Sequence, residues 1–245
     1  MYIKDIVEKM LGVRIVRPQG VVVLLEQVHL HRFLKEFAVD CVFDVGANEG
    51  QYAEMLRTHA GYKGHIVSLE PIPALAALLR KKAAHDPLWH IEEVALGANA
   101  GKATFNVMQK SAFSSLHAPT QSEVGLFTNA NKVTEQISVT IATLPEMFAK
   151  YQKELGFKRP FLKMDTQGHD LEIARGAGET LKQFVGLQSE LSIKRIYEDT
   201  SDYRVVLDYF ASQGFELSAF VPNNQGNFPQ LVEIDCIMYN KKFYD

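Results

Sequence analysis

The stretch that most constrains this chain is 42–50, where an apolar segment ends in an acid and a glycine-bearing turn. A segment with helical character follows at once, beginning at Gln51. Strand, glycine turn and helix are the start of a βαβ unit, whose turn lets a ligand approach the backbone at a helix N-terminus. The next predicted strand, 65–69, ends at Glu70, which follows Gly50 by 20 residues. An acid at about that separation (~20 residues) meets a ribose diol, so the sequence predicts a nucleoside ligand.

The glycine pattern of this turn distinguishes between two kinds of nucleoside ligand. A dinucleotide site needs G-x-G-x-x-G, but here no glycine lies between Gly46 and Gly50, and Asp44 precedes both. A carboxylate at Asp44 would repel a pyrophosphate and would attract the ammonium group of an amino-acid-bearing nucleoside. S-adenosylmethionine carries that ammonium group and a ribose diol, so it is the predicted ligand. The competing interpretation is an ordinary tight turn, with Asp44 and Glu70 as solvated strand ends.

Strands and helices alternate from residue 41 onward, which predicts an α/β fold with a mostly parallel sheet and helices on both faces. A short turn-rich linker joins the last two strands, so these are expected to pair antiparallel. A parallel sheet finished by one antiparallel strand is the class I, Rossmann-like methyltransferase arrangement. The predicted strands are 41–45, 65–69, 88–95, 160–165, 185–190, 215–220 and 231–239. The predicted helices are 50–59, 73–84, 143–155, 169–183 and 201–213.

The chain before this sheet is interpreted as a helical N-terminal extension, 1–40, preceding a methyltransferase domain, 41–245. Apolar residues between Ile3 and Leu11 fall on one helical face, and a second helix follows the breaker at 17–20. The apolar stripe of that second helix consists of Leu24, Leu25, Val28, Phe33, Leu34 and Phe37. The extension is expected to pack on the domain or on a second subunit, which leaves a homo-oligomer open.

An insertion lies between the third and fourth predicted strands of the sheet. Segments 102–107 and 136–141 alternate like half-buried strands, and the polar loop 108–134 lies between them. A loop this long inside a compact domain is usually a lid, a binding loop or a disordered segment. We interpret it as a lid over the acceptor, with disorder as the alternative. Its candidate substrate-binding residues are Ser114, Ser115 and His117.

A second strand, turn and helix lies downstream, and its strand is expected to end at Asp165. Ligands of open α/β sheets bind outside the carboxyl ends of the strands, so Asp44, Glu70, Asp165 and Glu190 should converge on one rim. A hydroxyl acceptor needs a base or a metal to take its proton. The catalytic candidates are therefore Asp165, His169 and Glu190, and the same three could hold a divalent cation. His169, in the first turn of its helix, is expected to be neutral. The alternative is that Asp165 only caps the helix and His169 is solvated.

The net charge and the motifs that the sequence lacks disfavour several other classes of function. The net charge of −3 gives no reason to expect nucleic acid. The chain lacks an Asn/Asp-Pro-Pro-aromatic turn, a Cys/His cluster with zinc spacing and a Walker loop. No apolar run reaches the roughly 20 residues of a membrane span and no secretory signal is visible, which predicts no membrane span and a cytoplasmic protein. Cys41 and Cys236 are expected to be buried free thiols.

Several motifs together resemble the FkbM family of S-adenosylmethionine-dependent methyltransferases. The matching pieces are FDVGANEGQY (43–52), SLEP (68–71), ALG (95–97), SSL (114–116), TLPEMF (143–148), KMDTQGHDLEIARGA (163–177) and QSEL (188–191), with Gly101, Phe105 and Asp235. The resemblance implies a class I methyltransferase fold and O-methylation of a hydroxyl on a sugar or secondary metabolite. The donor site that it implies is lined by Asp44, Gly46, Asn48, Gly50, Glu70 and Pro71. Two residues depart from the usual Asp-x-Glu-Gly-His/Tyr-Glu block: Gln167 replaces the glutamate, and Asp170 replaces the last acid.

The sequence as a whole predicts an S-adenosylmethionine-dependent O-methyltransferase acting on a hydroxyl of a sugar, glycan or polyketide-type metabolite. Asp44 and the 46–50 turn would hold the methionine end of the donor, Glu70 the ribose, and Val94 and Ala95 the adenine. One alternative is a non-catalytic scaffold with the same fold, since an altered motif is typical of a degenerate site. The other is a nicotinamide-dependent oxidoreductase, which the missing middle glycine disfavours.

Overall fold

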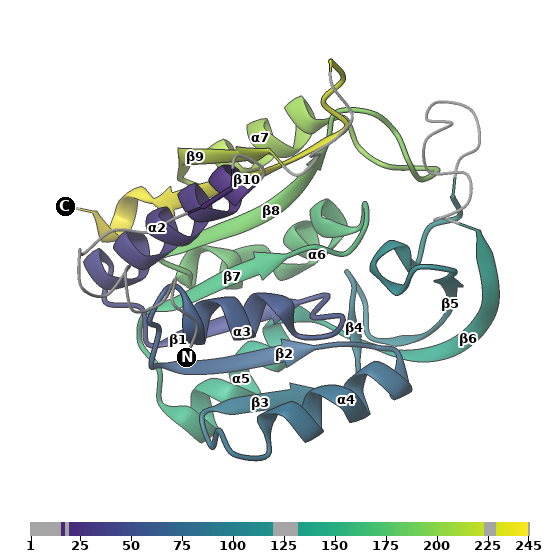
Figure 1. The fold of residues 1–245 in the computed structure, drawn as a ribbon, viewed down its shortest axis with the longest axis horizontal. Helices are drawn as coiled ribbons and strands as arrows, with labels where there is room; N and C mark the ends of the chain where they lie inside the picture. The colour runs from purple at the N-terminus through teal and green to yellow at the C-terminus, as the bar shows by residue number, and fades with distance from the viewer. Residues whose placement is uncertain (1–15, 18–19, 120–131, 223–228, 245) are drawn as a thin grey trace.

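The chain folds around one large β-sheet in a computed structural model that describes residues 16–17, 20–119, 132–222 and 229–244. The strands of this sheet are β1 (Cys41–Val45), β2 (His65–Leu69), β3 (Trp89–Glu92), β7 (Pro160–Met164), β8 (Gly186–Ser192), β9 (Phe215–Pro222) and β10 (Glu233–Asn240). Their order is β3-β2-β1-β7-β8-β10-β9, and β10 runs antiparallel to both of its neighbours (Figure 1). The predicted class I methyltransferase fold, with one antiparallel strand in a seven-stranded sheet, is confirmed.

Helices cover both faces of this sheet (Figure 1). One face carries α2 (Val21–Glu36), α3 (Gln51–Thr58) and α4 (Pro73–Ala83), and the other carries α5 (Leu144–Leu155), α6 (Asp170–Ala177) and α7 (Tyr203–Ser212). Successive side chains of a strand point to opposite faces, so Val42 packs in the first layer and Phe43 in the second. Every residue of β1 and β7 is buried, as expected for parallel strands covered on both faces, and each strand carries one buried charged residue, Asp44 in β1 and Lys163 in β7.

The insertion forms a second, three-stranded sheet from β4 (Ala95–Leu96), β6 (Val133–Ala142) and β5 (Gly101–Met108), in that order. The two predicted strands of the insertion are confirmed, and each is longer than predicted. The predicted strand 88–95 is confirmed as β3 in its first half and is wrong in its extent, because the chain leaves the main sheet after Glu92 and pairs again only as β4 with β6. Residues 120–131 of the predicted loop 108–134 lie outside the described part, so its interpretation as a lid stays a prediction.

The helix predicted at 169–183 is also wrong in its extent. It ends at Ala177, and a 3₁₀ segment, Gly178–Gln183, completes the connection to β8. Gly178 has φ of +51° and ψ of −131°, a non-helical conformation that glycine adopts without the steric cost of a side chain, and it stops the α-helix there.

The N-terminal extension is described from its second predicted helix onward, whereas the first, 3–11, lies outside the described residues. That second helix is α2, which packs Leu30, Phe33 and Leu34 against the sheet and α3. Two residues of its predicted apolar stripe, Leu25 and Val28, are instead 63% and 56% exposed. The extension was expected to pack on the domain or on a second subunit, and its helix α2 packs on the domain.

The two cysteines test a prediction about the core. Cys41 and Cys236 are both buried free thiols, as predicted. Among the described residues, no helix is both long enough and apolar enough to cross a membrane.

Candidate active site

A cavity of about 590 Å³ lies at the carboxyl ends of β1, β2 and β7, within the size range of small-molecule sites (roughly 300–1,000 Å³). The predicted site residues that line it are Gly46, Asn48, Glu70, Pro71, Val94, Ala95, Ser114, Asp165 and His169. Those that do not line it are Asp44, Gly50, Ser115, His117 and Glu190. The structure therefore brings most of the predicted donor residues together with Asp165 and His169 in one cavity, and it leaves the other five predicted residues outside the lining.

The turn between β1 and α3 forms the floor of this cavity, and steric constraints explain its two glycines. Gly46 has φ of +76°, and a Cβ at this position would lie 2.0 Å from the backbone oxygen of Asp165. Gly50 has φ of +87°, and a Cβ there would lie 2.7 Å from a side-chain carbon of Leu79. A side chain is thus excluded at both ends of the turn, and at Gly46 its absence makes room for the backbone of Asp165, while the glycine itself lines the cavity.

Glu70 lines the cavity next to this turn, and the backbone holds its carboxylate in place. The N–H groups of Asn48 and Ile72 donate to its two oxygens at 2.8 and 2.9 Å. Burial raises the pKa of Glu70 to about 7, against the lowering effect of those two hydrogen bonds. A carboxylate can accept about four hydrogen bonds, so both oxygens keep capacity for the hydroxyls of a ribose.

Asp44 is fully buried behind the turn, and its carboxylate is engaged inside the protein. Ser68 Oγ donates to Asp44 Oδ2 at 3.1 Å, and Lys163 Nζ lies 3.3 Å from Oδ1. Burial lowers the pKa of Lys163, but the carboxylates of Asp165 and Asp44 outweigh burial and hold that pKa above its usual range. A direct contact between Asp44 and the methionine end of the donor stays a prediction. In the structure, Asp44 instead pairs with Lys163, which lines the cavity.

Asp165 follows β7 and presents its carboxylate at the cavity wall, with its side chain 39% exposed. Gln167 Nε2 donates to Asp165 Oδ1 and to Glu190 Oε2, both at 2.8 Å. Tyr197 Oη donates to the amide oxygen of Gln167 at 2.7 Å and so fixes the direction of the amide. A glutamate in place of Gln167 would add a third acidic group at this point, so the neutral amide suits the surrounding acids.

The second departure from the family block, Asp170, has a structural explanation. Its fully buried carboxylate accepts hydrogen bonds from the Thr166 N–H at 2.9 Å, Ser189 Oγ at 2.8 Å and the Glu190 N–H at 3.1 Å. Asp170 thereby ties the turn after β7 to the neighbouring strand β8. Burial raises its pKa despite these hydrogen bonds.

The predicted substrate-binding residues lie in segment 111–117 and make different contacts. Ser115 is fully buried, donates to the backbone oxygen of Gln167 at 2.8 Å and accepts from the His117 N–H at 3.0 Å. Ser114 lines the cavity and accepts from the Met108 N–H at 3.0 Å. A direct role for either hydroxyl in binding an acceptor stays a prediction. In the structure, the hydrogen bonds of Ser114 and Ser115 hold segment 111–117 against the rest of the domain.

His169 lies at the start of α6 and contacts His117 through ring nitrogens 3.1 Å apart. Its pKa is lowered, first by burial and then by His117, which favours the neutral imidazole. The predicted metal trio of Asp165, His169 and Glu190 does not come together. In the described chain, the group of three with metal-ligand spacing is His117, His169 and Glu172.

Sequence reasoning missed a polar network that links distant parts of the cavity wall. Gln188 Nε2 donates to Glu26 of α2 at 2.9 Å and to Asp235 of β10 at 3.0 Å, and Tyr52 Oη donates to Gln188 Oε1 at 3.0 Å. Lys163 completes this wall. Lys163 could have been found, because a lone charge inside the apolar strand 160–164 needs a buried partner. The contact with Glu26 leaves no such signal in the sequence.

Comparison with known proteins gives one family and several distant structures. No curated protein matches the chain. Among solved structures, the N-methyltransferase NodS from Bradyrhizobium japonicum WM9 is 11% identical with a TM-score of 0.48, over 91% of this chain and 97% of that chain. The magnesium protoporphyrin IX methyltransferase from Synechocystis PCC 6803, with bound SAM, is 10% identical with a TM-score of 0.47, over 96% and 90%.

The strand order and the cavity at the ends of β1, β2 and β7 define a class I, S-adenosylmethionine-dependent methyltransferase. Residues 44–217 match the Methyltransferase FkbM domain, so the chain belongs to the FkbM methyltransferase family.

Proposed function

We propose that this methyltransferase transfers the methyl group to a hydroxyl of a small acceptor, of the sugar, glycan or polyketide type. The observation that carries the proposal is that Glu70 and Asp165 line the same cavity. A ribose-binding acid and a partly exposed carboxylate thus share one space, which is the arrangement that transfer to a hydroxyl requires.

The donor end of the cavity fits S-adenosylmethionine in shape and in chemistry. Gly46 lines this end of the cavity, and Glu70 offers two oxygens held by backbone N–H groups. Val94 and Ala95 supply an apolar stretch of wall for an adenine ring. The bound donor supplies a methyl group that its sulfonium already activates, so the protein mainly has to align the two reactants.

Asp165 would accept the proton of the acceptor hydroxyl, while the bound donor would give up its methyl group from sulfur to the acceptor oxygen and leave as S-adenosylhomocysteine. Its two oxygens lie near Gln167 Nε2 at 2.8 Å and Lys163 Nζ at 3.5 Å, which fixes the orientation of the carboxylate. His169 adds an imidazole to the same wall, and burial keeps it neutral. Glu190 acts through Gln167 and is a positioning residue, because it holds the amide that holds Asp165.

The acceptor side of the cavity combines polar and apolar walls. Ser111 and Ser114 bring hydroxyl groups, and Phe105 and Leu116 bring apolar surface. Ser111 Oγ also donates to the side-chain oxygen of Asn48 at 3.0 Å, so this segment reaches across to the donor turn. Such a mixture suits an acceptor with several hydroxyls on a partly apolar frame.

The test combines calorimetric binding with an acceptor screen. S-adenosylmethionine and S-adenosylhomocysteine are titrated into the wild type, Glu70→Ala and Asp165→Asn, with NAD as the control ligand. We expect Glu70→Ala to weaken donor binding at least about tenfold, since it removes charge-assisted hydrogen bonds of roughly 1.5–3 kcal/mol. Asp165→Asn should keep donor binding and lower kcat by about 10²–10⁴ on hydroxylated sugars or polyketides.

Glu49→Ala is the matched control, because Glu49 is exposed beside the same turn and does not line the cavity. Wild-type turnover in Asp165→Asn would overturn the assignment of the base. Methylation only of amine or thiol acceptors across the screen would overturn the proposal of O-methylation, while donor binding would stand.

A further inference from the structure

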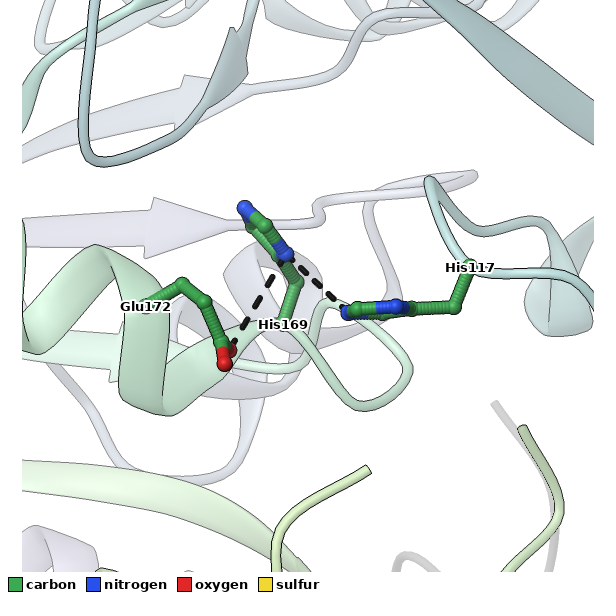
Figure 2. A group of neighbouring side chains, drawn as sticks. All are labelled: His117, His169 and Glu172. Atoms are coloured by element: carbon green, nitrogen blue, oxygen red, sulfur yellow. Dashed lines mark hydrogen bonds and ion pairs between the residues drawn. The ribbon is translucent and has the colours of Figure 1, made fainter. Parts of the chain in front are cut away.

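The contact between His117 and His169 continues into a third side chain that the methyl-transfer site does not use. Glu172 lies one turn further along α6, and its Oε2 is 4.0 Å from His169 Nδ1 (Figure 2). The ligand atoms His117 Nε2, His169 Nδ1 and Glu172 Oε2 all lie within 4.8 Å of one another. We propose that these three side chains bind one divalent transition-metal ion of the Zn²⁺ type.

The orientations of the three side chains support the binding of one shared metal ion. Figure 2 shows the ring of His117 approaching His169 from one side and the carboxylate of Glu172 from the other, with both interactions meeting at one His169 nitrogen. Metal–nitrogen and metal–oxygen distances near 2.0–2.2 Å place neighbouring ligand atoms about 3–3.5 Å apart. The imidazole pair is already at 3.1 Å. A small rotation of the Glu172 side chain closes the remaining distance.

The burial of a Glu172 carboxylate oxygen supports the metal site independently of the ligand spacing. In the part of the chain that the structure describes, its Oε2 is a buried oxygen that no hydrogen-bond donor reaches. An acceptor that is removed from water without a partner costs roughly 1–3 kcal/mol, more when it is charged. A cation between this oxygen and the two imidazoles would remove that cost.

His117 is positioned by its own backbone before any ion binds. Its N–H donates to Ser115 Oγ at 3.0 Å, and its carbonyl accepts from Asn106 Nδ2 at 3.1 Å. Ser115 is in turn bound to Gln167. His169 and Glu172 are fixed to each other by their spacing of three residues on α6, which places them on one face of the helix. Ligands that are held in this way lose little freedom on binding.

The ligand set selects the kind of metal. Two imidazoles and one carboxylate suit Zn²⁺ and its first-row neighbours, whereas Mg²⁺ and Ca²⁺ prefer oxygen ligands. A separate hollow of about 430 Å³ borders all three side chains and leaves room for water at open coordination positions. His169 also lines the methyl-transfer cavity. A metal on Nδ1 places the proton of that imidazole on Nε2, so Asp165 remains the base.

The test measures metal binding alone, on the full chain without a histidine tag and after chelator treatment. Zn²⁺ is titrated calorimetrically, Co²⁺ is followed by its visible absorption, and Mg²⁺ serves as the ion that should not bind. We expect one Zn²⁺ per chain. His117→Ala and Glu172→Gln should each weaken its binding at least about tenfold, since loss of an outer-shell partner already costs 10–100-fold.

His90→Ala is the matched control, because His65 and His90 make the same imidazole contact at 3.1 Å. No third ligand completes a group with that pair among the described residues, so this variant should bind Zn²⁺ like the wild type. If His117→Ala fails to fold by circular dichroism, Glu172→Gln decides, since it keeps the shape of the side chain. Absence of one-to-one binding, or equal affinity in wild type and Glu172→Gln, would overturn the proposal. Neither result depends on donor or acceptor binding, so the proposed methyl transfer is judged separately.

Discussion

Two strand–turn–helix segments meet at the cavity, and they resemble each other in backbone conformation but differ in how their acidic side chains are held. The donor turn, 44–50, follows β1, and the acceptor turn, 165–169, follows β7. They touch directly, because the Asp165 N–H donates to the Val45 carbonyl at 3.1 Å. Each has residues at positive φ, including Asn48 in the first and Gln167 in the second. Both turns therefore hold strained backbone where a ligand is expected.

The difference between the two turns lies in how their acids are neutralised. In the donor turn, the buried Asp44 is paired with a cation, Lys163. Around the acceptor turn, the same Lys163 lies 3.5 Å from Asp165, and the neutral amide of Gln167 donates to both Asp165 and Glu190. Burial there raises the pKa of Glu190 well above its usual value, and Glu233 and Asp165 add to that effect. Both turns therefore share one cation, whereas Glu190 beside the acceptor turn is held by a neutral amide in a buried surrounding rich in acids.

The largest expected effect is at the contact between the turns. Gly46→Ala places a Cβ 2.0 Å from the Asp165 carbonyl oxygen and forces a left-handed φ on alanine. We expect the free energy of unfolding to fall by more than about 4 kcal/mol, the range of exceptional single substitutions, together with loss of donor binding. Urea denaturation measures the first effect and calorimetry the second.

Gly156→Ala is the control for the backbone strain alone. Gly156 has φ of +68°, but nothing lies within 4 Å of its added Cβ. This variant should lose only about 1–2 kcal/mol. Equal losses in the two variants would show that the turns do not depend on their close approach.

The second effect tests the pairing of Asp44. Lys163→Met removes the cation between Asp44 and Asp165, so a fully buried carboxylate loses its partner. Breaking a buried ion pair on one side costs about 3–5 kcal/mol, and we expect a loss in that range by urea denaturation. In the double variant with Asp44→Asn, the loss should be smaller than the sum of the single losses.

Lys82→Met provides the comparison with an ordinary surface pair. Lys82 Nζ lies 3.0 Å from Glu54, and the two side chains are 28% and 47% exposed. This variant should lose less than about 1 kcal/mol. A loss of similar size in Lys163→Met would mean that the donor turn needs no neutralising cation.

The smallest effect concerns the acids near the acceptor turn. Burial raises the pKa of Asp235 to about 8, with a further contribution from Asp165. Because the folded-state pKa lies above the unfolded value near 3.9, the folded chain binds more protons between the two values. The stability from this group is therefore full below about pH 4 and is lost as pH rises toward 8.

Asp235→Asn should flatten the fall in the free energy of unfolding between pH 5 and 8, by less than about 1 kcal/mol per pH unit. Urea denaturation at several pH values measures the slope. Glu93→Gln is the control, because Glu93 pairs with Arg80 on the surface with its side chain 39% exposed. An unchanged slope in Asp235→Asn would assign the pH dependence to other acids.

The sequence by itself determined the structural features that depend on residues close together in the chain. The apolar run to Asp44, the glycines of the donor turn and the position of Glu70 follow from strand and turn chemistry within some 30 residues. The same holds for the strand that ends before Asp165. Short-range patterns of this kind carry both the period of the strand and the backbone demands of the turn.

What only the tertiary structure decided are contacts between residues far apart in the chain. Asp44 meets Lys163, Gln188 meets Glu26, and His117 meets His169, each because sheet order and register bring separate elements together. The sequence pattern names the face on which a side chain lies, but it does not name the partner across that face. For this reason most of the predicted donor residues line the cavity, whereas the network of the acceptor end became visible only in the fold.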